Sequence, residues 1–206
     1  MEYTLEVLDT IKQTLTSGLI EKLKIHHSVY RLPCTSEFLE ELIANILSEN
    51  GFTNDWKPNR SHSVSVDMTL DTGSSFSIKS GVYDPFKGVL KFSGSRLGKH
   101  KTLEDMISHV ESNSADYYVC VAKADQDWST VPCQNETKTY YLFVFDKNKL
   151  NYQTDNWFKK DKKDGSFKYH MEIDGMNASI VPSLSYQLWT TVSESIIDSP
   201  IKLEIQ

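Results

Sequence analysis

The segment from residue 63 to residue 81, SVSVDMTLDTGSSFSIKSG, alternates apolar and polar side chains on both sides of a turn sequence. Alternation with a period of two is typical of a β-strand that buries one face. The Asp-Thr-Gly at 71–73 predicts a three-residue hairpin loop, with Gly73 in the left-handed conformation. The segment therefore predicts a β-hairpin with one apolar and one polar face. The apolar face comprises Val64, Val66, Met68, Leu70, Phe76 and Ile78.

The polar face of this hairpin carries an acid, a hydroxyl and a base. With the loop at 71–73, Asp67 lies opposite Ser77; a loop shifted by one residue places Asp67 opposite Lys79 instead. Either register gathers Asp67, Ser77 and Lys79 on one wall of the hairpin. Such a cluster is suited to holding a divalent cation beside a phosphate. The alternative interpretation is an ordinary cross-strand ion pair, worth roughly 0.2–1 kcal/mol.

Size and composition indicate one ordinary globular domain. The chain has 206 residues, of which 24% are charged and 39% hydrophobic, enough for one well-buried core. No apolar run approaches the roughly 20 residues that span a bilayer, and a signal peptide pattern is not seen, so a cytoplasmic location is expected.

Cys34, Cys120 and Cys133 have no metal-type spacing and are expected to be reduced structural thiols. The adjacent His26 and His27 diverge in any regular element, so no zinc site is expected.

Charge is distributed unevenly along the chain. The formal net charge is −6, yet residues 86–101 contain six basic side chains, counting His100, and no acidic one. A second basic stretch, residues 156–168 (NWFKKDKKDGSFK), mixes lysines with aromatic side chains. Such polarisation is typical of a protein that turns one side toward DNA.

Hydrophobic periodicity predicts a helix over 3–24, with Gly18 as a weak point, and a second over 36–50 that ends at Asn50-Gly51. A strand over 89–92, a loop over 93–101 and a helix capped by Thr102 follow. Strands over 116–124 and 139–146 are apolar almost throughout, as central strands are. Residues 125–138 and 151–175 are expected to be loops or short edge hairpins, and the tail to add a short helix over 183–192 and a last strand. The expected fold class is α/β (α+β), with a mixed central β-sheet flanked by helices.

The predicted second helix and the hairpin together resemble the PD-(D/E)xK nuclease superfamily, and most of all its type II restriction endonucleases. In that pattern a glutamate precedes an amphipathic helix that ends in Gly-aromatic, here LEELIANILSENGF (39–52). A hairpin with an aspartate and then an acid-x-lysine follows, here Asp67 and Ser77-Ile78-Lys79. This sequence departs from the family at Ser77, which replaces the second acid. Neutral residues occur there in some type II restriction enzymes, and the departure favours one bound cation over two.

The resemblance implies a restriction-endonuclease-like core over about 36–124 within a single domain of residues 1–206, with recognition and dimerisation elements in 1–35 and 125–206. It implies a Mg²⁺ ion, for which Mn²⁺ substitutes, held by Asp67, Glu40 and the main-chain carbonyl of Ile78. Lys79 would orient the attacking water or stabilise the phosphorane charge, and Ser77 would act through water. By helical-wheel geometry Glu40 borders the apolar stripe, while the alternatives Glu37 and Glu41 lie nearer the opposite face.

The predicted DNA contacts are basic and hydroxyl residues around the loop that opens the third helix, because main-chain amides and cations there can hold phosphates. They are Lys91, Ser93, Ser95, Arg96, Lys99 and Lys101. A solvated surface turn is the alternative interpretation.

The implied function is that of a sequence-specific double-stranded DNA endonuclease, a type II restriction enzyme. It would act as a homodimer on a palindromic site, without a nucleotide cofactor or a membrane. A junction resolvase or repair nuclease, and a catalytically inactive DNA-binding module on the same fold, are the alternatives.

Overall fold

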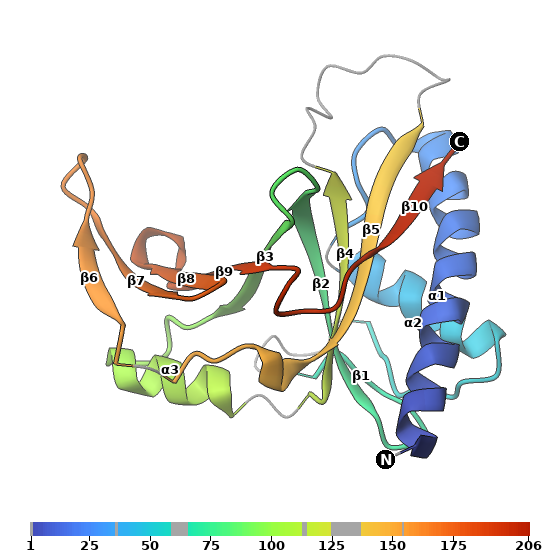
Figure 1. Ribbon diagram of the computed structural model, residues 1–206, viewed down its shortest axis with the longest axis horizontal. Helices are drawn as coiled ribbons and strands as arrows, with labels where there is room; N and C mark the ends of the chain where they lie inside the picture. Colours follow the sequence, from blue (N-terminus) through green and yellow to red (C-terminus); the bar gives the residue numbers. More distant parts are fainter. Residues whose placement is uncertain (1, 36, 59–65, 113–114, 125–136, 154) are drawn as a thin grey trace.

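The structure is a computed structural model that describes residues 2–35, 37–58, 66–112, 115–124, 137–153 and 155–206 (Figure 1). The helices are α1 (Glu2–Val29), α2 (Glu37–Glu49) and α3 (Leu103–Glu111), with short 3₁₀ helices η1 (Lys147–Lys149) and η2 (Pro182–Leu184). The strands are β1 (Met68–Thr69), β2 (Ser75–Asp84), β3 (Val89–Arg96), β4 (Tyr117–Ala124), β5 (Lys138–Asp146), β6 (Phe158–Asp161), β7 (Phe167–Ile173), β8 (Met176–Val181), β9 (Gln187–Ser193) and β10 (Ile201–Ile205).

All ten described strands belong to one mixed sheet. Its order is β10-β5-β4-β2-β3-β9-β8-β7-β6, and β1 pairs with β2 beside this path. β2 and β4 are parallel, whereas the other described pairs are antiparallel. Helices α1 and α2 lie on one side of the sheet, and α3 lies below the β6–β9 strands (Figure 1). The predicted fold class, a mixed sheet flanked by helices, is confirmed.

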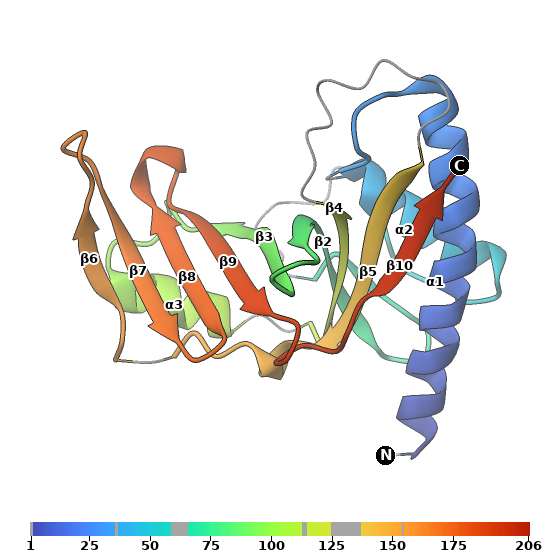
Figure 2. The ribbon, with the colours of Figure 1, turned by 45° about the horizontal axis from the view of Figure 1, so that its top comes forward.

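Two apolar cores lie on opposite faces of the central strands. In the first, Ile43 of α2 and Leu15 of α1 pack with Ile78 and Val119. In the second, Phe143 of β5 packs with side chains from α3 and from β7–β9, such as Met106, Met171 and Leu188. The sheet bends, and β6–β9 form a wing that turns away from β4 and β5 (Figure 2). β4 and β5 carry side chains in both cores, so the prediction that they are central strands covered on both faces is confirmed.

Gly18 does not interrupt α1, which continues to Val29. A Cβ at Gly18 would lie 2.4 Å from Cγ2 of Ile46, a fully buried residue of α2. The glycine therefore allows the two helices to approach closely, which a larger residue would prevent. The weak point predicted at this position is a packing contact instead.

Two predictions about secondary structure are wrong. β3 continues to Arg96, so residues 93–96 are strand rather than loop. The segment 183–192 contains most of β9 instead of a helix, because Leu188, Thr190 and Val192 are buried with a period of two. The predicted edge hairpin is present as β6 and β7, while residues 125–136 lie outside the described part of the chain.

Other expectations agree with the structure. Thr102 caps α3, and its Oγ1 accepts a hydrogen bond from the Asp105 N–H at 3.1 Å. Cys34 and Cys120 are free buried thiols, and burial raises the pKa of Cys34 to about 11 and that of Cys120 to about 12. Cys133 lies outside the described residues. Among the helices described, none has the length and apolarity that crossing a membrane would require.

Candidate active site

The β1–β2 hairpin forms in the first of the two registers considered. The Leu70 N–H donates to the Ser74 carbonyl at 2.9 Å, and Thr69 pairs with Ser75. Gly73 closes the turn with a φ of 88°, the left-handed conformation that glycine adopts without strain. The register that would place Asp67 opposite Lys79 is therefore wrong. Of the predicted strand before Asp67, residues 63–65 lie outside the described ranges.

One edge of β2 is shared by two strands that leave a gap between them. β1 pairs with the beginning of β2, and β3 pairs with its end, from Gly81 to Asp84. Between them, residues 77–80 have no strand partner on this edge within the described part of the chain, whereas their other edge pairs with β4. We call this gap the fork. It exposes main-chain groups of a central strand beside the end of β1.

The Asp67 side chain lies in the fork and accepts three hydrogen bonds at Oδ2. The donors are the Ile78 N–H at 2.7 Å, the Ser77 hydroxyl at 3.2 Å and the Lys79 ammonium at 3.2 Å. Asp67 and Lys79 are 17% and 20% exposed, and Ser77 is 1% exposed. The structure thus brings the predicted acid, hydroxyl and base together. The ion pair of the alternative interpretation is present within the same cluster.

The Ile78 carbonyl points into the fork on the same side as Asp67. In a β-strand the N–H and C=O of one residue point to the same edge, and the Ile78 N–H donates to Asp67. This is the main-chain group that the sequence predicts as a metal ligand.

Glu40, in the first turn of α2, lies near this cluster. It is half-buried, while Glu37 and Glu41 are exposed, as the helical-wheel argument predicts. Burial raises the pKa of Glu40, the negative charge of Asp67 raises it further, and Lys79 opposes both. A hydrogen bond with the Trp56 side chain also lowers the Glu40 pKa. Sequence reasoning missed Trp56, because it lies in the irregular segment between α2 and β1 where no periodicity marks it.

The donors around the fork fit a hard divalent cation. Two carboxylates and a carbonyl offer oxygen ligands. The repulsion from Asp67, which adds to burial in raising the Glu40 pKa, is what a cation between the carboxylates would relieve. Among the described residues no cluster of three or more His, Cys, Asp or Glu side chains could hold a metal. A cation here would therefore rely on water for much of its shell, as Mg²⁺ usually does.

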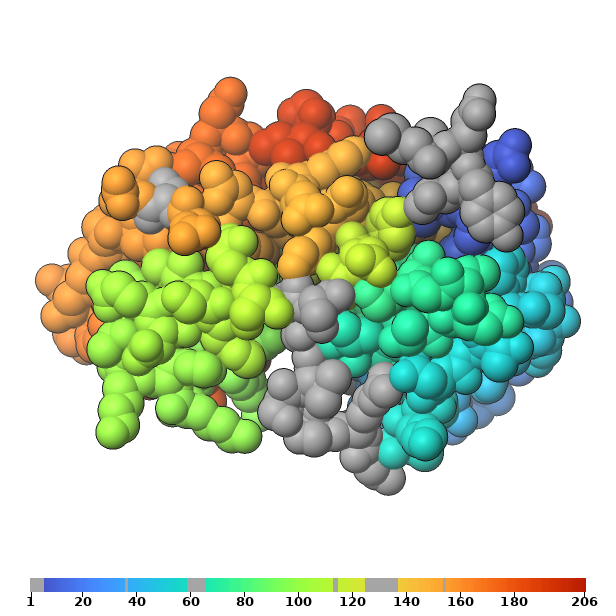
Figure 3. Space-filling view, turned by 90° about the horizontal axis from the view of Figure 1, so that it is seen from below, coloured from blue at the N-terminus to red at the C-terminus, as the bar shows by residue number. Residues whose placement is uncertain are grey.

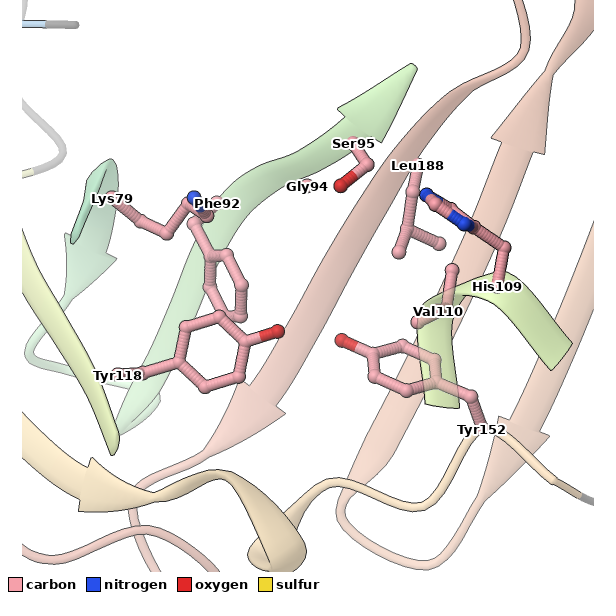
Figure 4. A pocket seen from close by; sticks show the side chains of 9 residues that line it. All are labelled: Lys79, Phe92, Gly94, Ser95, His109, Val110, Tyr118, Tyr152 and Leu188. Carbon is pink, nitrogen blue, oxygen red and sulfur yellow. The ribbon is translucent and has the colours of Figure 1, made fainter. Parts of the chain in front are cut away.

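The predicted DNA contacts do not all share one face. A bulge between Ser93 and Arg96 shifts the register of β3 against β9. Ser95 lines a small pocket with Lys79 and His109 (Figure 4). The Arg96 Nε instead donates to the Gln187 Oε1 at 3.4 Å. Lys99 and Lys101 are exposed in the turn before α3. The strand, and not a phosphate-holding loop, thus presents residues 93–96.

The pocket itself has space for about one water molecule. Figure 4 shows Lys79 at one end and His109 at the other, with the Tyr118 and Tyr152 hydroxyls between them. This volume is too small for a nucleotide. On the face seen in Figure 3, α3 (yellow-green) and the β1–β2 hairpin (blue-green) are both visible.

Glu40→Gln tests the cation site without an activity assay. The folded protein raises the Glu40 pKa above its ordinary value of 4.5, so protonated Glu40 stabilises the folded state. This stabilisation is complete below pH 4.5 and is lost as pH rises through the raised pKa. The uncharged glutamine avoids this loss, so the metal-free variant is expected to be at least as stable as the wild type at pH 7. Mg²⁺ should then stabilise the wild type, by about 2.7 kcal/mol at one hundred times its Kd, and the variant much less.

The measurement is thermal unfolding with and without Mg²⁺, at neutral pH and near pH 4. Glu41→Gln, an exposed neighbour on the same helix, is the matched control and should respond to Mg²⁺ as the wild type does. Equal stabilisation of the Glu40 variant and the wild type by Mg²⁺ would remove Glu40 from the site.

Comparison of the chain with protein-family models, with curated proteins and with solved structures found no match in any of the three.

Proposed function

We propose that this protein is a Mg²⁺-dependent endonuclease that cleaves double-stranded DNA at specific sequences, as type II restriction enzymes do. The observation that carries the proposal is the convergence of Asp67, Ser77 and Lys79 in the fork, with Glu40 beside them. An ordinary ion pair gives no reason for a second, half-buried carboxylate at the same place, since the repulsion between the two acids costs free energy. A cation and a phosphate supply such a reason.

Each residue of the site has a role in this proposal. Asp67, Glu40 and the Ile78 carbonyl would hold the cation. Bound Mg²⁺ would supply positive charge to the scissile phosphate and acidify a water molecule. The Lys79 ammonium would orient the attacking water and offset the charge that develops on the phosphate oxygens.

Ser77 supports a site with one cation. Its buried hydroxyl stands where the family pattern has a second acid, and it donates directly to Asp67. A hydroxyl that donates to the carboxylate holds that carboxylate in place but adds no negative charge. The serine therefore positions Asp67, and a second cation would lack a carboxylate ligand at this position.

A homodimer in the cytoplasm belongs to the same proposal. A palindromic target requires a two-fold arrangement of two active sites. Apolar side chains at the end of α1 and just after it are exposed, which supports an interface between two copies there. They are Ile25, Val29, Tyr30 and Leu32, at 58%, 70%, 61% and 70% exposure.

The test of the proposed function is incubation of the purified protein with plasmid DNA and Mg²⁺. Discrete fragments with uniform ends support a sequence-specific endonuclease. Preference for branched over linear duplexes would assign the protein to the resolvase alternative. Binding without cleavage would assign it to the inactive module.

Arg96→Ala is expected to weaken DNA binding to all sequences alike, because Arg96 is exposed at the end of β3 and would contact phosphate. The slope of log K against log salt should become shallower by about 0.9, the share of one phosphate contact. Equilibrium binding in EDTA at several salt concentrations measures this. Arg31→Ala, also exposed but just after α1, is the matched control. A change in sequence preference with an unaltered salt slope would contradict a phosphate role for Arg96.

A further inference from the structure

The wing formed by β3, β9, β8, β7 and β6 has one buried side and one open side (Figure 2). On the buried side, Phe92, Leu188 and Met171 pack into the second core. Because side chains alternate along a strand, the intervening residues turn to the other side, which no described helix covers in Figures 1 and 2. We call this side the basic face. Its members used below are Lys91, Arg96, Lys160, Lys168, Ser179 and Trp189.

Contacts link these residues from one edge of the wing to the other. Lys160 lies directly opposite Lys168, and the Lys168 ammonium donates to the Ser179 hydroxyl at 3.0 Å. Ser179 pairs with Trp189. The Lys91 ammonium lies 5.4 Å from the centroid of the Trp189 ring. The line runs from β6 to β3, about 19 Å at the usual strand spacing. That length corresponds to about five or six base pairs of duplex DNA.

The ammonium groups of the basic face repel one another. Burial lowers the pKa of Lys168, and the charges of Lys160, Lys162 and Lys91 lower it further. Like charges directly opposite each other destabilise a strand pair. The acidic Glu172 shares this side of β7, and its carboxylate lies 3.9 Å from the His170 Nε2. The chain as a whole has a net charge of −6, but on this face the lysines dominate. A polyanion bound here would relieve the repulsion among them.

β3 connects the basic face with the candidate active site. β3 pairs with β9 from Val89 to Arg96 on one edge, while the pairing of its other edge with β2 ends at the Gly81–Phe92 pair. Val82 pairs with Lys91 and Gly81 with Phe92, so the side chains of Lys91 and Lys79 lie on opposite sides of the sheet. The basic face therefore begins beside the fork, on the side of the sheet away from Lys79.

We propose that the basic face binds the phosphate backbone of double-stranded DNA, on the side of the sheet opposite to the Ser77 and Lys79 side chains. The inference rests on the proposed function, because it takes duplex DNA as the substrate. Lysine contacts to phosphates supply affinity that is independent of sequence, and they fix the position of the duplex on the protein. The basic stretch at 156–168 thus contributes Lys160 and Lys168 from an edge hairpin.

The test is the double variant Lys160→Gln/Lys168→Gln, whose binding to a short duplex of arbitrary sequence is measured in EDTA across a salt series. The slope of log K against log salt is expected to become shallower by about 1.8, since each phosphate contact contributes about 0.9. The matched control, Lys159→Gln/Lys202→Gln, removes the same charge elsewhere and should leave the slope unchanged. Lys159 lies over the Phe167 ring on the other side of the hairpin, and Lys202 lies on β10.

Thermal unfolding checks that each variant folds. The single variant Lys160→Gln changes one exposed residue of an edge strand and should show half of the effect. Equal slopes in the double variant and its control would overturn the inference. Tighter lysine-dependent binding to single-stranded RNA, or to vesicles of anionic lipid, than to the duplex would also overturn it.

The same variants separate this inference from the proposed function. If the wild type leaves plasmid uncut but the double variant loses salt-dependent binding, the basic face stands and the endonuclease does not. If the wild type cuts plasmid and the double variant binds and cuts equally well, the endonuclease stands and the basic face does not.

Discussion

Asp67→Asn is expected to abolish Mg²⁺-dependent cleavage, with a fall in rate of at least about 10³-fold. The asparagine has the size of aspartate but no negative charge, so it holds a cation poorly. Its side-chain oxygen can still accept the Ile78 N–H that Asp67 accepts now, so the fold should persist. Duplex binding in EDTA should also persist, because the proposed phosphate contacts lie elsewhere on the protein. Single-turnover cleavage and salt-dependent binding are the two measurements.

Asp71→Asn is the matched control for this variant. Asp71 is an exposed residue in the turn of the same hairpin, so its replacement changes the same charge without touching the fork. It should cut DNA at the wild-type rate. If the Asp67 variant cuts as fast as the Asp71 variant, the fork is not the place of catalysis.

Lys79→Met is expected to lower the cleavage rate by about 10²–10³-fold while leaving cation binding possible. The methionine keeps the aliphatic length of the side chain but removes the ammonium that contacts Asp67 at 3.2 Å. Lys79 lowers the Glu40 pKa in the wild type, so its removal should raise that pKa further. Binding of Mg²⁺, which requires ionised Glu40, should therefore need a higher pH in the variant.

Two measurements separate these effects: single-turnover cleavage at saturating Mg²⁺, and Mg²⁺ affinity as a function of pH. Lys87→Met, in the exposed turn at the far end of β2, is the matched control. A Lys79 variant that binds Mg²⁺ but does not cut agrees with a role at the phosphate. Full cleavage by this variant would leave Lys79 as an ordinary partner of Asp67.

The local part of the site could be predicted from the sequence. A period of two and the Asp-Thr-Gly turn determine which residues of the hairpin share a face, so Asp67, Ser77 and Lys79 were expected together. The helical wheel likewise distinguishes Glu40 from its acidic neighbours. Both predictions depend on positions a few residues apart, where backbone geometry alone decides the outcome.

The long-range part could not be predicted. The fork exists because the pairing of β3 with β2 ends at Phe92 while β3 continues along β9, about 100 residues further along the chain. Side chains such as Leu188 and Val192 suit a strand or a helix equally well until their partners are known. The bulge in β3, which places Arg96 rather than Ser95 on the side of Ser93, leaves no local signal beyond small residues. The basic face required the same long-range pairing before its lysines could be placed together.

The central claim is that the fork holds a divalent cation, and anomalous scattering from a crystal soaked in Mn²⁺ tests it most directly. We expect one anomalous peak within coordination distance of the Asp67 carboxylate and the Ile78 carbonyl, with Glu40 turned toward it. The peak should be absent from crystals of Asp67→Asn and present in those of Asp71→Asn. Two results in the wild-type crystal would contradict the account. Mn²⁺ could bind only elsewhere, or the Asp67 carboxylate could contact Lys79 and no metal ion at saturating Mn²⁺.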